Sequence, residues 1–344
     1  MSTKTNTTSS ESQTGTTEDD VEIEESVVET SVDPEPESEE LEDTDGTHSE
    51  PDVGDEEQEN ESSAEASPEQ TDGTEEDDIE EAETESEIEE ETISGPPSQF
   101  QTALKGGVIR DFVSTLRAIV DEAKLTVTPD GITTRAVDPA NVAMYDVQLR
   151  SGAFESYDAS EGLLGINLER LDEVLKLAKK NDLVQMTFDT STFKLIIHID
   201  GVEFSMACID PDSIRPEPDI PEMDLPISFT LDERQVSRGV KAADMVSDHI
   251  RFRCDETNDT VHIEAEGDTD DVSLELTKDD LESITPAEGT ALYSLDYVKD
   301  LSREFPKNDE LSLTFGQEFP MMIEYGLADG ECEVLAMLAP RIET

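Results

Sequence analysis

Basic residues are scarce in this sequence. Its 344 residues include 23 Lys and Arg against 88 Asp and Glu, and the formal net charge at pH 7 is −65. Residues 1–97 hold 38 of the acidic residues and one basic residue, so residues 98–344 still carry a net charge of −28. A body this acidic repels itself unless salt screens it, and the Debye length falls from about 10 Å at 0.1 M to about 3 Å at 1 M. The composition favours a protein of a high-salt organism over an ordinary acidic protein.

The sequence also lacks tryptophan, has only three cysteines and contains no long apolar run. A membrane-spanning helix needs about 20 consecutive apolar residues, and a secretory signal needs an apolar core near the N-terminus. Neither pattern is present. Cys208, Cys254 and Cys332 form an odd set without short spacings, which argues against a disulfide framework and a zinc site. We expect reduced thiols inside strands, no membrane segment and a cytoplasmic location.

Motifs of nucleotide-binding and hydrolytic enzymes are missing as well. There is no G-x-G-x-x-G, P-loop, G-x-S-x-G or H-E-x-x-H pattern. His198, His249 and His262 occur in apparent strands without Cys or His at metal-ligand spacing, which favours structural roles. We expect no catalytic residues, no metal and no cofactor. A hydrolase that uses paired carboxylates is a rival hypothesis, but with so many acidic residues chance pairs are common.

Residues 1–97 contain no aromatic residue and consist largely of Glu, Asp, Ser and Thr. Such a segment buries too little apolar surface to offset its chain entropy, so we expect a disordered acidic tail. The tail could recruit partners, imitate a nucleic acid or simply keep the protein solvated.

From about Phe100 a pattern of a short strand, an amphipathic helix and several further strands recurs. Apolar residues at helical spacing predict helices within residues 107–122, 167–180, 233–245 and 294–305. Alternating or apolar runs predict strands at 125–127, 142–149, 195–199, 202–209, 250–254, 261–266, 272–276, 311–315 and 333–338. Four such units indicate two similar α+β domains, each with two helices on one face of a strand-rich layer.

A proline-rich segment, residues 210–226, separates the two pairs of units. Its five prolines exclude a helix or a central strand and predict an extended connector. Ile214, Ile220, Met223 and Leu225 are too many apolar residues for a solvated linker, so we expect the connector to lie against the body.

The few basic residues are concentrated in the predicted helices. These four ranges hold 11 of the 22 basic residues of 98–344, and several share a helix face, such as Arg110 with Arg117 or Arg238 with Lys241. If the helices face one way, a polyanion could bind there through phosphate contacts that read no sequence. Ordinary solvated helix surface explains the same pattern. The concentration of basic residues in these helices argues against a third hypothesis, an acidic storage or cation-binding protein.

Several runs of the chain resemble the archaeal sliding clamp family, proliferating cell nuclear antigen (PCNA), and above all its form in salt-loving archaea. The runs are RAVDPANVAM (135–144), AFESY (153–157), GINL (165–168), the connector IDPDSIRPEPDIPEMDLP (209–226), KAADMVSDHI (241–250), EAEGDTDDV (264–272), SLDYVKD (294–300) and LAPRI (338–342). The resemblance extends from about Phe100 to Thr344, and the acidic tail has no counterpart in it.

The resemblance implies a non-enzymatic DNA sliding clamp: a ring of three identical subunits around double-stranded DNA that tethers DNA polymerase and other replication and repair proteins. The chain would divide into a disordered tail (1–97), clamp domain 1 (98–209), an interdomain connector (210–226) and clamp domain 2 (227–344). Helices would line the hole, antiparallel sheets would form the outer wall, and binding to DNA would be independent of sequence. Partners would include the clamp loader and other proteins that carry a clamp-binding motif.

Together with the helix stripes, the resemblance assigns three sets of site residues. DNA-facing residues are Arg110, Arg117, Lys176, Lys180, Arg238, Lys241, Lys299 and Arg303. The partner-motif pocket comprises Val137, Val142, Ile220, Pro221, Met223, Pro320, Met337, Ala339 and Pro340. The subunit interface comprises Val202, Phe204 and Met206 of one subunit against Val272, Leu274 and Leu276 of the next. Glu173 and Asp296 are acidic where relatives often carry a base, so DNA contact is expected to be weak.

Overall fold

The structure is a computed structural model that describes residues 93–216, 220 and 223–342. The predicted disorder of the tail concerns residues that lie, except for 93–97, outside this part. The described chain begins on the body itself: the Gly95 carbonyl accepts a hydrogen bond from the Leu163 amide at 2.7 Å, and Pro97 is buried. The boundary at residue 97 stays a prediction.

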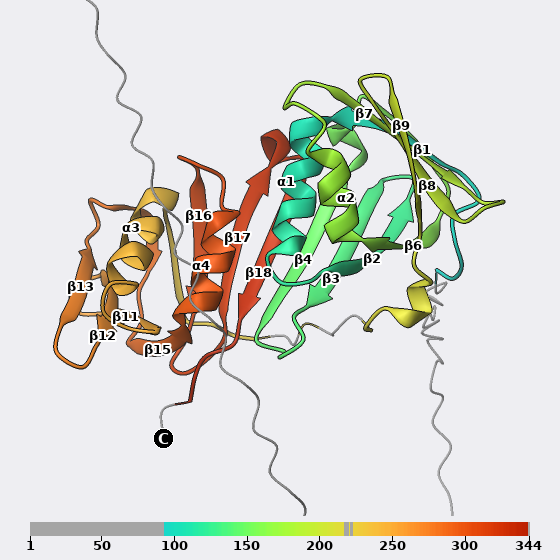
Figure 1. Cartoon of the computed structure of the whole chain (residues 1–344). Coiled ribbons are helices and arrows are strands. Elements are labelled where there is room, and N and C mark those ends of the chain that lie inside the picture. The colour runs from blue at the N-terminus through green and yellow to red at the C-terminus, as the bar shows by residue number, and fades with distance from the viewer. Residues whose placement is uncertain (1–92, 217–219, 221–222, 343–344) are drawn as a thin grey trace, which may run out of the picture. The chain divides into compact units, whose positions relative to one another are not determined.

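The first half of the body contains two helices and nine strands (Figure 1). In chain order they are β1 (Phe100–Lys105), α1 (Gly106–Arg117), β2 (Glu122–Thr128), β3 (Gly131–Val137), β4 (Ala143–Arg150), β5 (Ser156–Ala159), β6 (Gly162–Asn167), α2 (Leu168–Leu175), β7 (Leu183–Asp189), β8 (Lys194–Ile199) and β9 (Val202–Ala207).

The second half repeats the same order of elements. It comprises β10 (Ile227–Asp232), α3 (Glu233–Ala243), β11 (His249–Asp255), β12 (Thr260–Glu266), β13 (Asp271–Leu276), β14 (Leu281–Thr285), β15 (Gly289–Ser294), α4 (Leu295–Arg303), β16 (Glu310–Phe315), β17 (Met321–Leu327) and β18 (Cys332–Leu338). The internal repeat that the sequence predicted is therefore present element by element.

The strands form three antiparallel sheets rather than one layer in each half. Their orders are β5-β1-β7-β8-β9, β14-β10-β16-β17-β18-β4-β3-β2-β6 and β13-β12-β11-β15. The nine-stranded sheet joins the halves, because β4 pairs with β18 from Leu149 opposite Cys332 to Ala143 opposite Leu338. Strands β9 and β13 each lie at the edge of a sheet.

All four helices lie on the same side of the sheets (Figure 1), and each buries one apolar stripe. On α1, Phe112 and Leu116 are buried, as the apolar spacing predicted, and Ile109 is buried as well. Val108 of the predicted stripe is only half-buried, and Ile119 lies beyond α1, which ends at Arg117 and is shorter than predicted. Asn167 caps α2, because its side chain accepts a hydrogen bond from the Arg170 amide at 2.7 Å. The start of α1 packs closely against the turn after α2: a Cβ on Gly106 would lie 2.5 Å from the carbonyl oxygen of Lys179.

Three local predictions are corrected. The predicted helix 167–180 is too long: α2 ends at Leu175, and Lys176, its C-cap, and Lys180 belong to the turn that follows. The connector is not extended throughout, since Pro211–Ser213 form one 3-10 turn that the Asp210 side chain caps. Cys208 lies just past the end of β9, whereas Cys254 and Cys332 lie within β11 and β18; all three are free thiols.

Candidate nucleic-acid and protein-binding surfaces

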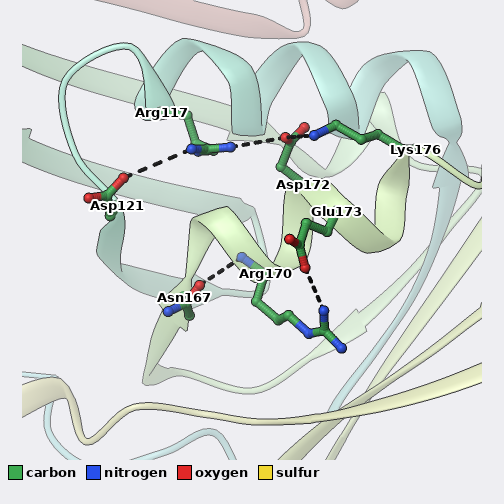
Figure 2. A network of polar contacts seen from close by, with 7 residues as sticks. All are labelled: Arg117, Asp121, Asn167, Arg170, Asp172, Glu173 and Lys176. Atoms are coloured by element: carbon green, nitrogen blue, oxygen red, sulfur yellow. Dashed lines mark hydrogen bonds and ion pairs between the residues drawn. The ribbon is translucent and has the colours of Figure 1, made fainter. Parts of the chain in front are cut away.

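A network of ion pairs connects α1 and α2 of the first helix pair (Figure 2). Asp172 on α2 accepts from Arg117 Nη1 at 3.0 Å and lies 2.9 Å from Lys176 Nζ. Asp121 is a second, longer partner of Arg117 at 3.9 Å. One carboxylate thus pairs with two of the predicted DNA-facing cations.

The other predicted DNA-facing residues fall into two groups. Three are occupied: Arg110 donates to the Ala178 carbonyl at 3.2 Å, Lys299 pairs with Asp244 at 2.6 Å, and Arg303 pairs with Asp300 at 2.5 Å. The other three are exposed, and no carboxylate of the described residues comes within 4.0 Å of them; these are Lys180, Arg238 and Lys241. Their contact with DNA stays a prediction.

A buried carboxylate at Asp138 joins the two halves and the connector. Its side chain is 3% exposed and accepts from the amides of Val142 at 2.6 Å and Ala143 at 2.8 Å and from Tyr297 Oη of α4 at 2.7 Å. The Asp138 carbonyl accepts from Arg215 of the connector at 2.7 Å. Burial acts to raise the pKa of Asp138, but these hydrogen bonds to the charged form outweigh it, so the pKa lies below its usual value.

The connector lies against the body at its first part, as predicted. Ile214 is 8% exposed. Beside it is a cavity of about 590 Å³ whose walls include Val120, Ala123, Lys124, Arg135, Val137, Pro139, Ile214, Arg215 and Pro216. This cavity shares only Val137 with the predicted partner pocket.

The described residues of the predicted pocket are all partly exposed, and Pro221 lies outside the described part of the chain. Strand register places Val137 opposite Met144, and Met144 opposite Met337. Ala339 donates to the Val142 carbonyl at 2.8 Å. Tyr145 and Ala336, the next pair along, are fully buried in the core, so the Val137–Met144–Met337 row faces the side of the sheet away from the helices.

Val137, Val142, Met337 and Ala339 are therefore brought together, and Pro320 precedes Met321, which pairs with Leu338. Ile220, Met223 and Pro340 are half-buried, and their place in a pocket stays a prediction.

The predicted interface residues lie on the two edge strands. On β9, Val202 is exposed, Phe204 is half-buried beneath the Arg170 guanidinium, 4.9 Å from its ring, and Met206 is buried. On β13, Val272 and Leu274 are half-buried and Leu276 is buried. Apart from Val202, these side chains pack mainly into their own core, so each edge exposes chiefly its unpaired backbone.

Comparison with known proteins agrees with this architecture. A family model described as the N-terminal domain of proliferating cell nuclear antigen matches residues 100–211. The DNA polymerase sliding clamps of Haloarcula marismortui and Halobacterium salinarum are each 44% identical over 245 residues, which are 71% of this chain and 99% of each relative. This chain belongs to the DNA polymerase sliding clamp family.

Solved structures resemble the fold of this clamp. The A. fulgidus PCNA, solved with the C-terminal region of FEN-1 bound, has a TM-score of 0.68 and 32% identity over 71% of this chain and 99% of that one. The Thermococcus kodakaraensis PCNA has a TM-score of 0.65 and 28% identity over 70% of this chain and 100% of that one. The α+β clamp fold with antiparallel sheets, expected from the sequence, is confirmed.

Sequence reasoning missed two residues of this clamp. Asp138 stood within a quoted motif but received no role, because nothing local in the sequence reveals that Tyr297 reaches it. Met144 has a usable signal, since strand alternation from Val142 places it on the same face.

Among the described residues, no cluster of three or more metal-binding side chains occurs, and none of the helices has the length and apolarity needed to cross a bilayer.

Proposed function

We propose that this clamp closes into a ring of three copies by pairing β13 of one subunit with β9 of the next. The observation that carries the proposal is the junction inside the chain. There, β4 of the first half pairs with β18 of the second. The repeat makes β13 the counterpart of β4 and β9 the counterpart of β18, and each of these two strands lies at an edge of its sheet. Pairing them between copies repeats the internal junction and satisfies both edges.

The repeat also predicts the register of this interface. Asn167 and Ser294 are equivalent positions, because each directly precedes the second helix of its half. When the strand pairings are followed from these two residues, Val147 of the first half corresponds to Leu274 of the second, and Asp146 corresponds to Ser273. The same procedure from Lys105 and Asp232 aligns Val334 with Val202 and Leu335 with Glu203. Because Val147 pairs with Val334 and Asp146 with Leu335, the interface should place Leu274 opposite Val202 and Ser273 opposite Glu203.

Leu274→Pro tests the ring. Proline removes a backbone donor and disturbs an edge strand, so the variant should be monomeric where the wild type is trimeric. The measurement is the mass of the intact assembly at molar salt. Leu274→Ala, which keeps the donor, is the matched control and should remain trimeric. A trimeric proline variant would contradict this assignment of the edge.

The helix side of the ring would surround duplex DNA. Cations on α1 to α4 and the turn after α2 can contact phosphates without reading bases, while closure of the ring keeps the protein on DNA even when contacts are weak. In this role the clamp has no catalytic residue: it is a processivity factor in the cytoplasm of a prokaryotic cell, where the DNA lies.

The surface around Val142, Met337 and Ala339 would bind the short motif of polymerase, clamp loader and other partners, with the connector above it. Support comes from the partly exposed apolar row on the outer side of the sheet and from the A. fulgidus PCNA, whose structure holds a FEN-1 segment. Burial of a few large side chains at about 25 cal/mol per Å² exceeds the ordering costs only modestly, so micromolar affinity is expected.

Ile220→Asp tests this pocket. A charge in an apolar contact costs desolvation energy, so a peptide with a glutamine, an aliphatic residue and two aromatics should lose at least tenfold in affinity while the trimer persists. The measurement is fluorescence titration at molar salt. Met245→Asp, at an 83% exposed methionine, is the control and should bind like the wild type. Equal affinity for Ile220→Asp and wild type would place the pocket elsewhere.

A further inference from the structure

One ion pair recurs in both helix pairs with its charges exchanged. In the first half Arg117, the last residue of α1, pairs with Asp172 on α2 at 3.0 Å. In the second half Asp244, the C-cap of α3, pairs with Lys299 on α4 at 2.6 Å.

The repeat makes these positions equivalent. Arg117 and Asp244 both stand twelve residues after the N-cap residue of their helix, Lys105 or Asp232. Asp172 and Lys299 both stand five residues after theirs, Asn167 or Ser294. The cation is on the first helix in one half and on the second helix in the other.

We propose that this ion pair holds the paired helices together. We propose also that DNA phosphates are contacted instead by the predicted DNA-facing cations whose side chains make neither an ion pair nor a hydrogen bond among the described residues: Lys180, Arg238 and Lys241. The proposal rests on the DNA-encircling function proposed above. An ion pair that holds two helices together needs only opposite charges, so exchanging the charges preserves it. A phosphate contact needs a cation, and Asp244 stands where Arg117 would have to be repeated.

The surroundings of Arg117 support the first part. Its side chain is 27% exposed and that of Asp172 is 20% exposed, so the pair is largely removed from water. Arg117 Nε is buried without a hydrogen-bond partner among the described atoms. A phosphate that bound Arg117 would leave the largely buried Asp172 with only Lys176 as a cationic partner and would place another negative charge beside it. The exposed pair of Arg303 and Asp300 is different, because such surface pairs exchange partners at little cost.

The surroundings of the three proposed contacts support the second part. Arg238 and Lys241 stand three residues apart on α3 and are exposed. The acidic neighbours of Arg238 and Lys180 act only at longer range. Hydrogen bonds from Thr277 lower the pKa of Asp280, and Arg238 adds a smaller effect. Burial raises the pKa of Asp111, and the opposing effect of Lys180 is smaller. Lys180 lies in the turn after α2, beside Gly107. These side chains can meet a phosphate without breaking an ion pair.

A charge-exchange cycle in the full-length protein tests the ion pair between the helices without DNA. Arg117→Asp and Asp172→Lys together copy the arrangement of the second half. Each single variant should lower the midpoint of denaturant unfolding at molar salt, and the double variant should recover more than half of the loss. If the two losses in unfolding midpoint simply add in the double variant, the proposed role of the ion pair between the helices is overturned.

The DNA arm compares Arg117→Gln with Lys241→Gln, which remove one cation each. The affinity for a short fluorescent duplex is measured by anisotropy over a salt series in which the trimer persists. Lys241→Gln should weaken binding and reduce the slope of log K against log salt by about 1, whereas Arg117→Gln should leave the slope unchanged. Asp172→Asn should strengthen binding, because it frees Arg117 and Lys176. Equal slope losses for the two glutamine variants would overturn the assignment of contacts. A further outcome is that the wild-type trimer binds no duplex at any salt while the double variant still recovers its unfolding midpoint. That result would contradict the DNA-encircling function but not the role of the ion pair between the helices.

Discussion

At the scale of single residues, Asp138 adds side-chain hydrogen bonds to the joint between the two halves, which the pairing of β4 with β18 forms. It receives hydrogen bonds from a loop of the first half and from Tyr297 of the second, and its carbonyl holds the connector through Arg215. The predicted partner surface begins beside it, at Val137 and Val142. Hydrogen bonds to a buried charged group contribute more than neutral ones, so this small cluster fixes the approach of three segments.

Replacing Asp138 by Asn should destabilise the protein, because the amide nitrogen would face donors that now meet a carboxylate oxygen. The expected loss is about 2 kcal/mol of unfolding free energy at pH 7, the range for leaving a buried donor unsatisfied. The pKa of Asp138 is lowered by folding, so its stabilisation is present above the unfolded pKa of about 3.9 and is lost as pH falls through the folded value. Denaturant unfolding between pH 7 and pH 3 should therefore show a smaller acid-induced loss in Asp138→Asn than in the wild type.

Glu155→Gln provides the control, since Glu155 is 55% exposed and its partner Lys105 lies 3.5 Å away. This variant should change stability by less than about 1 kcal/mol. Equal acid dependence of Asp138→Asn and wild type would show that Asp138 does not contribute through its charge.

At the scale of elements, the helices could be predicted from the sequence and many strands could not. Val236, Val240 and Ala243 have helical spacing, and all are buried on α3. Strand β3 was missed because Thr133 and Arg135 alternate with its buried positions, so no apolar run marks it. The junction of β4 with β18 has no local signal at all, because pairing between residues far apart in the chain depends on packing of the whole body. For the same reason the sequence could group the basic residues but not reveal that Asp172 forms ion pairs with two of them.

The proposed register between β13 of one subunit and β9 of the next, inferred from the pairing of β4 with β18, can be tested by cross-linking. Ser273→Cys together with Glu203→Cys should form an intersubunit disulfide on mild oxidation, because directly opposed residues have Cβ atoms about 4.5–5.5 Å apart. Both positions are exposed, and the native cysteines lie elsewhere. The product is a covalent dimer or trimer on a denaturing gel without reductant.

Ser273→Cys with Ser205→Cys shifts the pair by two residues and serves as the control. It should cross-link much more slowly, since diagonal neighbours are about 7–8 Å apart. Faster cross-linking of the shifted pair would show that the internal junction and the subunit interface differ in register.

At the scale of the whole molecule, charge limits assembly. Each body carries −28 from residues 98–344, and three copies would bring this charge together. The proposed interface adds a local cause, because Glu203 of one edge and Asp271 and Glu275 of the other are exposed on the same face of the joined sheet. The relatives from Haloarcula marismortui and Halobacterium salinarum fit an environment where salt screens such repulsion.

Lowering the salt from the molar range to about 0.1 M should therefore dissociate the trimer, because the Debye length grows to about 10 Å and the acidic edges repel each other. Asp271→Asn with Glu275→Gln should shift the dissociation midpoint to lower salt. Glu155→Gln with Glu161→Gln removes the same charge from exposed positions away from the edge, and should shift the midpoint much less. Light scattering across a salt series measures both. Equal shifts would mean that total charge, rather than repulsion across the β9 and β13 edges, sets the salt requirement, and a wild-type trimer that persists at 0.1 M would contradict the requirement itself.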